Sequence, residues 1–149
     1  MALTGTFDRT LDDKLRLAIP KPVRDGFSGT EISEFYLTPG NEGCLCLYSA
    51  AGFEQLASRL AQVSTGKSDV RSFLRLFYSQ SERVNSDRQF RIRIPERLVK
   101  FAGLAHDVVL IGVHDHVEIW DKKRWESFLS RHESQFDELT SLALEIPVT

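Results

Sequence analysis

The sequence has little cysteine and no long hydrophobic run, so it offers little for disulfide bonds or for membrane anchoring. It contains two cysteines and one methionine among 149 residues. Cys44 and Cys46 are close neighbours in one strand-like run, so they provide no disulfide framework. The longest apolar runs, such as 108–113, are too short to span a bilayer. Residues 1–5 have neither a basic flank nor a hydrophobic stretch. We therefore expect a protein of the reducing cytoplasm, without a signal peptide and without a membrane partner.

An excess of positive charge is also missing. The 19 Lys and Arg residues face 21 Asp and Glu residues, a formal net charge of −2, which argues against bulk attraction to nucleic acid. The charges are unevenly spread, however. Six basic and two acidic residues lie between Arg83 and Lys100, whereas four basic and nine acidic residues follow from Phe101 onward. Such clustering is typical of a nucleic-acid-binding surface on an acidic protein. The alternative is that arginines on exposed strands merely keep sheet edges soluble.

The chain contains an internal repeat. Residues 12–23 and 87–98 both begin with Asp-x-x-x-Arg and continue with an apolar residue, one further residue and Ile-Pro. Later, residues 45–48 align with 117–120. With 42% hydrophobic and 27% charged residues, the composition excludes wholesale disorder. A unit of half this length has a marginal core alone, so we expect two copies that share one core with pseudo-two-fold symmetry. We assign residues 1–78 to the first repeat and 79–149 to the second.

Each repeat has the same expected plan. Two short strands flank an Asp-containing turn, and a short helix begins at Pro20 or Pro95, where proline is tolerated. A hairpin follows, and apolar residues at helical spacing then predict helices. In the first repeat these fall on either side of a turn at 64–68, and in the second they form one amphipathic helix from Lys122 to about Leu144.

The repeated Asp-x-x-x-Arg, running into apolar-x-Ile-Pro, resembles the signature of the MraZ family of bacterial transcriptional regulators, which are built from two tandem SpoVT–AbrB-type domains. The resemblance covers nearly the whole chain. It extends to Gly43-Cys44-Leu45-x-Leu47-Tyr48 and to Val117-Glu118-Ile119-Trp120-Asp121 with the following Lys123-Arg124-Trp125.

The resemblance implies both a fold and a function. The fold is α+β: the two repeats form a pseudo-two-fold swapped-hairpin β-barrel with flanking helices. The function is that of a sequence-specific DNA-binding regulator, a repressor, of a division and cell-wall gene cluster. Its partner is double-stranded DNA, bound at short promoter direct repeats by a ring-shaped homo-oligomer in the cytoplasm, on the nucleoid. It implies no enzyme activity, small-molecule substrate or cofactor.

The same resemblance places DNA contact on the two strand–turn units. Arg16 and Arg91 are the expected contacts, since a guanidinium can engage guanine in the major groove. Basic neighbours are expected to touch DNA or its phosphates, which position a protein without specifying sequence: Lys14, Arg88, Lys21, Arg24 and Arg93. Asp12 and Asp87 are repelled by phosphate. We expect each to cap its own turn or to orient the arginine four residues on.

The sequence departs from the family pattern in both turns. The family usually has Gly before the motif Arg, whereas Leu15 and Phe90 stand there in this chain. If the turn requires a positive φ, a non-Gly residue costs about 1–2 kcal/mol. A second hypothesis follows: an interaction module of the same fold that has lost DNA readout and uses Leu15 and Phe90 as an apolar patch. A third is an antitoxin, but the C-terminus reads as a helix instead of a toxin-wrapping tail. We predict that Gly at both positions preserves the fold and strengthens or broadens DNA binding.

The remaining reactive side chains favour no enzyme and no metal site. Cys44 and Cys46 point to one strand face, but no further ligand has a matching spacing, so buried structural thiols are expected. His114 and His116 have the same i, i+2 geometry at a hairpin tip, where solvated rings are the usual outcome. Trp120 and Trp125 are expected in the core.

Overall fold

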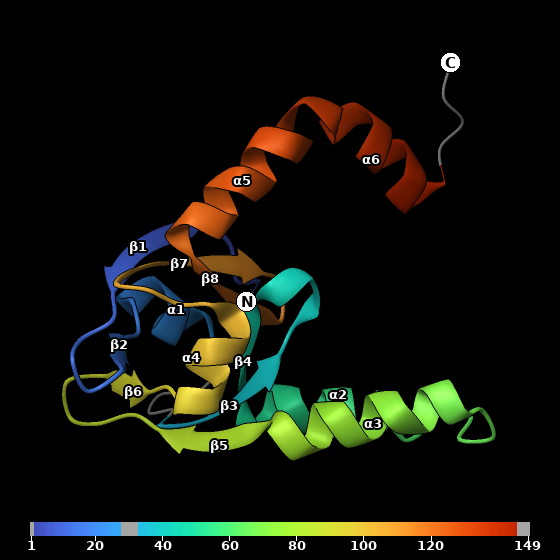
Figure 1. Cartoon of the computed structure of the whole chain (residues 1–149), viewed down its shortest axis with the longest axis horizontal. Coiled ribbons are helices and arrows are strands. Elements are labelled where there is room, and N and C mark those ends of the chain that lie inside the picture. The colour runs from blue at the N-terminus through green and yellow to red at the C-terminus, as the bar shows by residue number, and fades with distance from the viewer. Residues whose placement is uncertain (1, 28–32, 146–149) are drawn as a thin grey trace.

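The computed structural model describes residues 2–27 and 33–145 (Figure 1). The strands are β1 (Thr6–Thr10), β2 (Arg16–Ala18), β3 (Glu34–Pro39), β4 (Leu45–Ser49), β5 (Glu82–Asn85), β6 (Arg91–Arg93), β7 (Asp107–Val113) and β8 (His116–Asp121). The helices are α1 (Lys21–Gly26), α2 (Ala50–Leu60), α3 (Ser68–Gln80), α4 (Glu96–Ala102), α5 (Lys122–His132) and α6 (Phe136–Leu144). Two short 3₁₀ turns, η1 (Asn41–Gly43) and η2 (Glu133–Gln135), complete the order.

The strands form one six-stranded antiparallel sheet, in the order β1-β7-β8-β4-β3-β5, and a separate two-stranded ladder of β2 and β6. The first strand of each repeat pairs with the hairpin of the other, because β1 lies beside β7 and β5 beside β3. The two repeats therefore complete one another's sheet, as the short strands of a marginal half-core require. The expected mixed α and β architecture is confirmed. These pairings do not by themselves close a barrel.

Two strand pairs lie on the pseudo-two-fold axis of the molecule. Leu17 pairs with Ile92, its equivalent in the second repeat, and Cys46 pairs with its equivalent Glu118. Equivalent residues can face each other across antiparallel strands only where the axis passes between those strands. The axis therefore passes through the β2–β6 ladder and through the β4–β8 pair at the centre of the large sheet.

One face of the large sheet covers the main core, to which both repeats contribute. Leu17, Ile92 and Leu98 are fully buried in it. Replacing one of these residues by Ala costs about 2–5 kcal/mol. The other face carries two smaller aromatic clusters. Phe53 and Phe77 pack α2 and α3 over β3 and β4, and Trp120 packs with Trp125 and Phe128 of α5. Both tryptophans thus lie in or against a core, as expected.

The helices that follow the two hairpins extend away from the sheet as two arms, α2–α3 and α5–α6 (Figure 1). The expected single helix from Lys122 to Leu144 is wrong, because η2 interrupts it. Its apolar stripe also remains uncovered beyond α5, with Phe136, Leu142 and Leu144 72%, 76% and 66% exposed. The turn expected at 64–68 does separate α2 from α3, which starts at Ser68.

Candidate nucleic-acid interface

The turn between β1 and β2 is fixed by the side chain of Asp12. Its Oδ1 accepts the backbone N–H groups of Lys14 and Arg16 at 2.9 and 2.8 Å, and its Oδ2 accepts Nε–H of Arg16 at 2.7 Å. The backbone adds a further bond from Leu15 N–H to Asp12 O at 2.9 Å. One carboxylate therefore both caps the turn and orients the motif arginine.

The second repeat builds the same turn with different residues around it. Asp87 Oδ1 accepts from Gln89 and Arg91 backbone N–H at 2.8 and 3.0 Å, and Oδ2 accepts Nε–H of Arg91 at 2.9 Å. In both turns the backbone N–H of the motif arginine, together with its guanidinium, lowers the pKa of the aspartate below its ordinary value. Both carboxylates are therefore charged at neutral pH. In both repeats the Asp-x-x-x-Arg spacing lets one carboxylate bind the backbone N–H and the Nε–H of the arginine four residues later.

The two arginines lie on the outward face of the β2–β6 ladder. Leu17 and Ile92 point into the core, so the residues on either side of them point outward. Arg16 is paired with Arg93, and Ala18 with Arg91. Like charges directly opposite one another destabilise a ladder. Of each guanidinium, the aspartate binds only Nε, so within the described ranges the terminal nitrogens of Arg16 and Arg91 make no hydrogen bond. This face therefore presents guanidinium groups whose free N–H donors can bind an anion.

The other basic residues named from the sequence divide into two groups. Lys14 and Arg88 are exposed on the two turns, and Arg93 is exposed on β6. Lys21 and Arg24 lie on α1 and are engaged within the chain. Lys21 Nζ donates to Asp25 at 2.8 Å, and the Arg24 guanidinium lies 3.7 Å above the centre of the Phe90 ring.

Leu15 and Phe90 have the positive φ that their place in the turn demands, at 62° and 60°. Their carbonyl groups bind the opposite repeat: Ile94 N–H donates to Leu15 O, and Ile19 N–H donates to Phe90 O, each at 2.8 Å. Leu15 is half-buried against the main core, whereas Phe90 is 45% exposed beneath Arg24. The two side chains thus contact the fold instead of forming one shared apolar patch.

The stacking of Arg24 on Phe90 could not be found by reading either repeat alone, because it joins a helix of the first repeat to a turn of the second. A signal is present in the alignment of the repeats: Arg24 is equivalent to Val99 and Phe90 to Leu15. An apolar pair at one of the two equivalent contacts between helix and turn therefore corresponds to a cation and an aromatic ring at the other.

The cysteines and histidines lie on the far side of the β4–β8 pair, away from the turns. Cys44 and Cys46 are buried, as expected. The absence of a further ligand was wrongly expected, because the strand register brings Glu118 opposite Cys46. The repeat alignment makes these two residues equivalent, but only the strand register between the repeats shows that they meet. His114 is exposed at the hairpin tip, with a φ of 68°.

His116 is not a solvated turn histidine. Its ring stacks on Tyr48 with centroids 5.0 Å apart, and its Nδ1 lies 2.7 Å from Asp115 Oδ1. The Cys44 thiol, together with the His116 ring, lowers the pKa of Cys46 to about 6. Although burial favours the neutral ring, hydrogen bonds with Cys46 and Asp115 raise the pKa of His116 to about 9. The two shifts have opposite directions, and each group favours the charged form of the other.

Comparison with known proteins finds the same repeat. A family model described as "MraZ protein, putative antitoxin-like" matches residues 2–76 and again 77–145. The chain is 39% identical over 124 residues to the transcriptional regulator MraZ of Acetivibrio thermocellus, covering 83% of this chain and 84% of that protein. It is 38% identical over 136 residues to the transcriptional regulator MraZ of Salinispora arenicola, covering 91% of this chain and 92% of that protein. No helix in the described part of the chain is long and apolar enough to cross a membrane.

Proposed function

Because the chain belongs to the MraZ family, whose curated relatives are named transcriptional regulators, we propose that it is a sequence-specific DNA-binding transcriptional regulator. In finer detail, it represses a division and cell-wall gene cluster and binds short direct repeats in a promoter. It does so as a ring-shaped homo-oligomer in the cytoplasm, on the nucleoid. It acts by binding and catalyses no reaction.

The observation that carries the proposal is the pair of aspartate-oriented arginines, Arg16 and Arg91, on one outward ladder. A side chain whose Nε is already bound loses less conformational freedom when its terminal nitrogens meet a base or phosphate. In this arrangement Arg16 and Arg91 read base edges. Lys14, Arg88 and Arg93, exposed around them, neutralise phosphates.

Two further parts of the proposal are the swapped-hairpin barrel, which the pseudo-symmetry supports, and the ring-shaped oligomer, which the exposed helices support. The exchange of β1 and β5 between repeats supports the swapped-hairpin barrel, in which the β2–β6 ladder forms one end. Uncovered apolar side chains on α3 and α6 support self-association. Those more than 40% exposed are Phe73, Leu76, Tyr78, Phe136, Leu139, Leu142 and Leu144. A ring of chains would engage several repeats and gain affinity through effective concentration.

The alternative function is that of an interaction module that no longer binds DNA specifically. This hypothesis requires Leu15 and Phe90 to form an exposed apolar patch. Their contacts with the core and with Arg24 leave only part of the Phe90 ring exposed. The structure favours the regulator for this reason. An antitoxin role has no specific support in the described geometry.

A gel-shift titration tests the proposal. The full-length protein is titrated against the DNA upstream of its own gene and against unrelated DNA of equal length. A regulator binds the upstream DNA more tightly, typically by 10³-fold or more for specific recognition. Equal affinity for both DNAs, or no binding with the oligomer intact, would contradict the proposal and support the module.

A further inference from the structure

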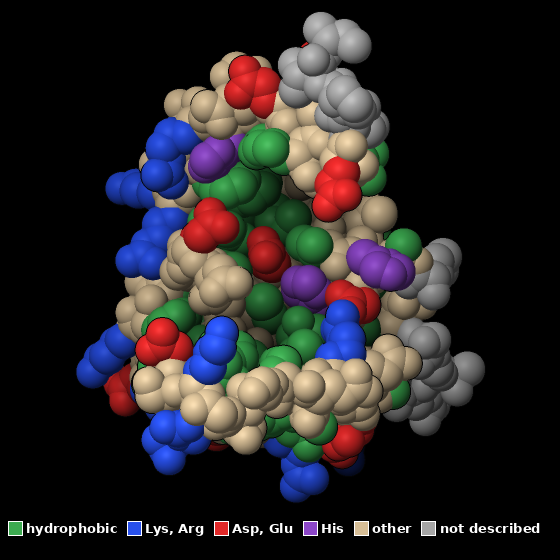
Figure 2. Space-filling model, turned by 90° about the vertical axis from the view of Figure 1, so that its right-hand side faces the viewer, with side chains coloured by type: hydrophobic (Ala, Val, Ile, Leu, Met, Phe, Trp, Pro, Cys, Tyr) green, Lys and Arg blue, Asp and Glu red, His purple; other side chains and the backbone are tan. Residues whose placement is uncertain are grey.

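Between the two helical arms lies a cleft of about 530 Å³ whose floor is the outer face of the large sheet. Leu56, Leu60, Phe73 and Phe77 line one wall, and Trp125 and Phe128 line the other. Figure 2 shows this hollow, with hydrophobic side chains around it and acidic and histidine side chains gathered at its centre. Polar groups on an otherwise apolar floor are costly to bury unless they have a partner.

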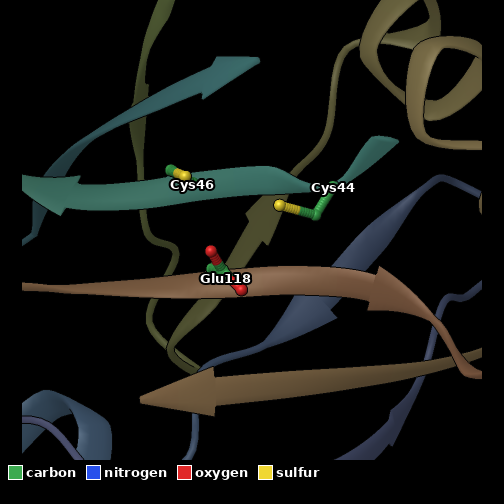
Figure 3. A group of neighbouring side chains, drawn as sticks. All are labelled: Cys44, Cys46 and Glu118. Atoms are coloured by element: carbon green, nitrogen blue, oxygen red, sulfur yellow. The ribbon is translucent and has the colours of Figure 1, made fainter. Parts of the chain in front are cut away.

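Three metal-ligating side chains lie close together here: Cys46 and Glu118 line the cleft, and Cys44 is buried beside them. The sulfurs of Cys44 and Cys46 and a carboxylate oxygen of Glu118 all lie within 4.8 Å of one another. Cys46 points from β4, Cys44 from the residue immediately before β4, and Glu118 from β8, all toward the same space (Figure 3). A tetrahedral zinc ion has sulfur ligands at about 2.3 Å, so neighbouring ligand atoms lie roughly 3–4 Å apart. The separations of the three atoms, all within 4.8 Å, are therefore already close to that spacing.

The position of the three ligands is set by rigid structure. Cys46 and Glu118 are direct cross-strand partners at the pseudo-two-fold axis, and Cys44, in extended backbone immediately before β4, lies two residues from Cys46. Trp120 Nε1 donates to Glu118 Oε1 at 3.0 Å, which fixes the carboxylate. The sites that bind metals tightly have such supporting hydrogen bonds around their ligands.

A buried hydroxyl without a partner points to the same place. Thr38 is 1% exposed, is the direct cross-strand neighbour of Cys46 on β3 and lines the cleft. Within residues 2–27 and 33–145, its Oγ1 has no hydrogen-bond partner. A buried hydroxyl of this kind needs an acceptor. A metal-bound thiolate of Cys46 would supply one.

We propose that Cys44, Cys46 and Glu118 bind one thiophilic divalent cation of the zinc class, with a fourth coordination position toward the cleft. Two sulfurs with one carboxylate exclude magnesium and calcium, which prefer oxygen ligands. As the cation binds, each thiol that carries a proton releases it to solvent. His116 lines the same cleft, with Nδ1 held by Asp115, so its other ring nitrogen is the candidate for the fourth ligand once that nitrogen has released its proton to solvent.

The cation would join the two repeats, because β4 belongs to the first and β8 to the second. A ligand that binds only the folded state stabilises it by RT ln(1 + c/Kd), where c is the concentration of the free ligand, so the melting temperature rises with the concentration of the cation. The site lies across the large sheet from the β2–β6 ladder. It therefore does not require DNA binding, and its test is independent of the proposed function.

A Co²⁺ titration of the reduced full-length protein under argon tests the site. Because Co²⁺ bound by thiolate absorbs strongly in the near ultraviolet, we expect a charge-transfer band that saturates at one Co²⁺ per chain and is removed by Zn²⁺. Cys46→Ser and Cys44→Ser should each reduce the band by about half or abolish it, and Glu118→Gln should weaken Co²⁺ affinity by about tenfold or more. Zn²⁺ should also raise the melting temperature of the parent protein and slow the reaction of both thiols with a disulfide reagent.

His114→Gln is the matched control, because it removes an exposed ligand-type side chain two residues from His116 and should leave the band unchanged. Circular dichroism of each variant establishes that the fold is retained. A parent protein with no charge-transfer band in excess Co²⁺ would overturn the proposal. So would a band that persists in the Cys44→Ser/Cys46→Ser double variant, or thiols whose reactivity is unaffected by Zn²⁺.

Discussion

Leu15 and Phe90 occupy the same left-handed turn position but have different surroundings. Leu15 gains packing against the main core, whereas Phe90 is 45% exposed and contacts Arg24. A positive φ costs a non-Gly residue about 1–2 kcal/mol. An exposed cation–π contact offsets about 0.5–1 kcal/mol of that cost. The two substitutions by glycine should therefore have different effects.

We predict that Phe90→Gly leaves the free energy of unfolding unchanged or raises it slightly, and that it tightens DNA binding because Arg24 becomes free to contact phosphate. Leu15→Gly removes apolar packing and should destabilise the protein by about 1 kcal/mol or more, even though it relieves the same backbone strain. Urea denaturation and DNA titration of both variants measure these effects. Equal stability losses in the two variants, with unchanged DNA affinity, would contradict this interpretation.

Because Asp12 and Asp87 hold the two turns, the stability of the fold should depend on pH in the acid range. Backbone N–H groups and the motif arginine lower the pKa of Asp12 and Asp87 in the folded state. Their contribution to stability is therefore complete above the ordinary pKa of 3.8 and is lost as the pH falls through the lowered folded value. We predict that Asp12→Asn/Asp87→Asn has a lower melting temperature at neutral pH.

The same double variant should lose less stability than the parent protein between about pH 5 and about pH 2. Thermal melts across this range measure the difference. Asp13→Asn is the matched control, since Asp13 is an exposed neighbour and the side-chain hydrogen bonds of the described turn come from Asp12 instead. Parallel acid profiles for parent and double variant would argue that the carboxylates do not hold the turns.

At the scale of elements, local patterns predicted strands and short helices well. Pro20 and Pro95 stand immediately before α1 and α4, and the Asp-x-x-x-Arg spacing predicted the turns, because both effects act within a few residues. The interruption at η2 was not predicted, since no proline or glycine marks it. Strand order was beyond local patterns too, because β1–β7 and β3–β5 join residues from different repeats.

The exposed apolar residues of α6 carry a prediction about assembly. Leu142 is 76% exposed, so its replacement hardly affects the folding of one chain. If α6 packs against a second copy, Leu142→Glu buries a charge at that interface and should dissociate the oligomer. Size-exclusion chromatography with light scattering measures the mass. Glu138→Gln on the same helix is the control, and an unchanged mass for Leu142→Glu would exclude α6 from the interface.

At the scale of the whole molecule, the pseudo-two-fold axis organises both proposed sites. It passes through the β2–β6 ladder with its arginines and through the β4–β8 pair with Cys46 and Glu118. The repeat in the sequence predicted that symmetry and a shared core. It could not predict which equivalent residues meet at the axis, because that depends on strand register between the repeats. For the same reason Glu118 was missed as a neighbour of Cys46.

The net charge of −2 is an average over surfaces that differ in sign. The ladder and its turns are basic, whereas the chain from Phe101 onward is acidic. In the proposed function, DNA binds at the end of the molecule that carries this ladder. Its affinity should therefore depend on salt through the few phosphates that this end neutralises.

The most direct measurement is the affinity for upstream DNA as a function of salt concentration, followed by fluorescence anisotropy. It compares the parent protein with Arg16→Ala/Arg91→Ala and with the control Arg75→Ala, which changes an exposed residue of α3. We predict that the parent binds and that its affinity falls as salt rises. The double variant should lose about 1–3 kcal/mol for each base-reading arginine with its oligomeric mass unchanged. Arg75→Ala should match the parent. An affinity that is the same in all three proteins at every salt concentration would contradict DNA recognition by the β2–β6 ladder.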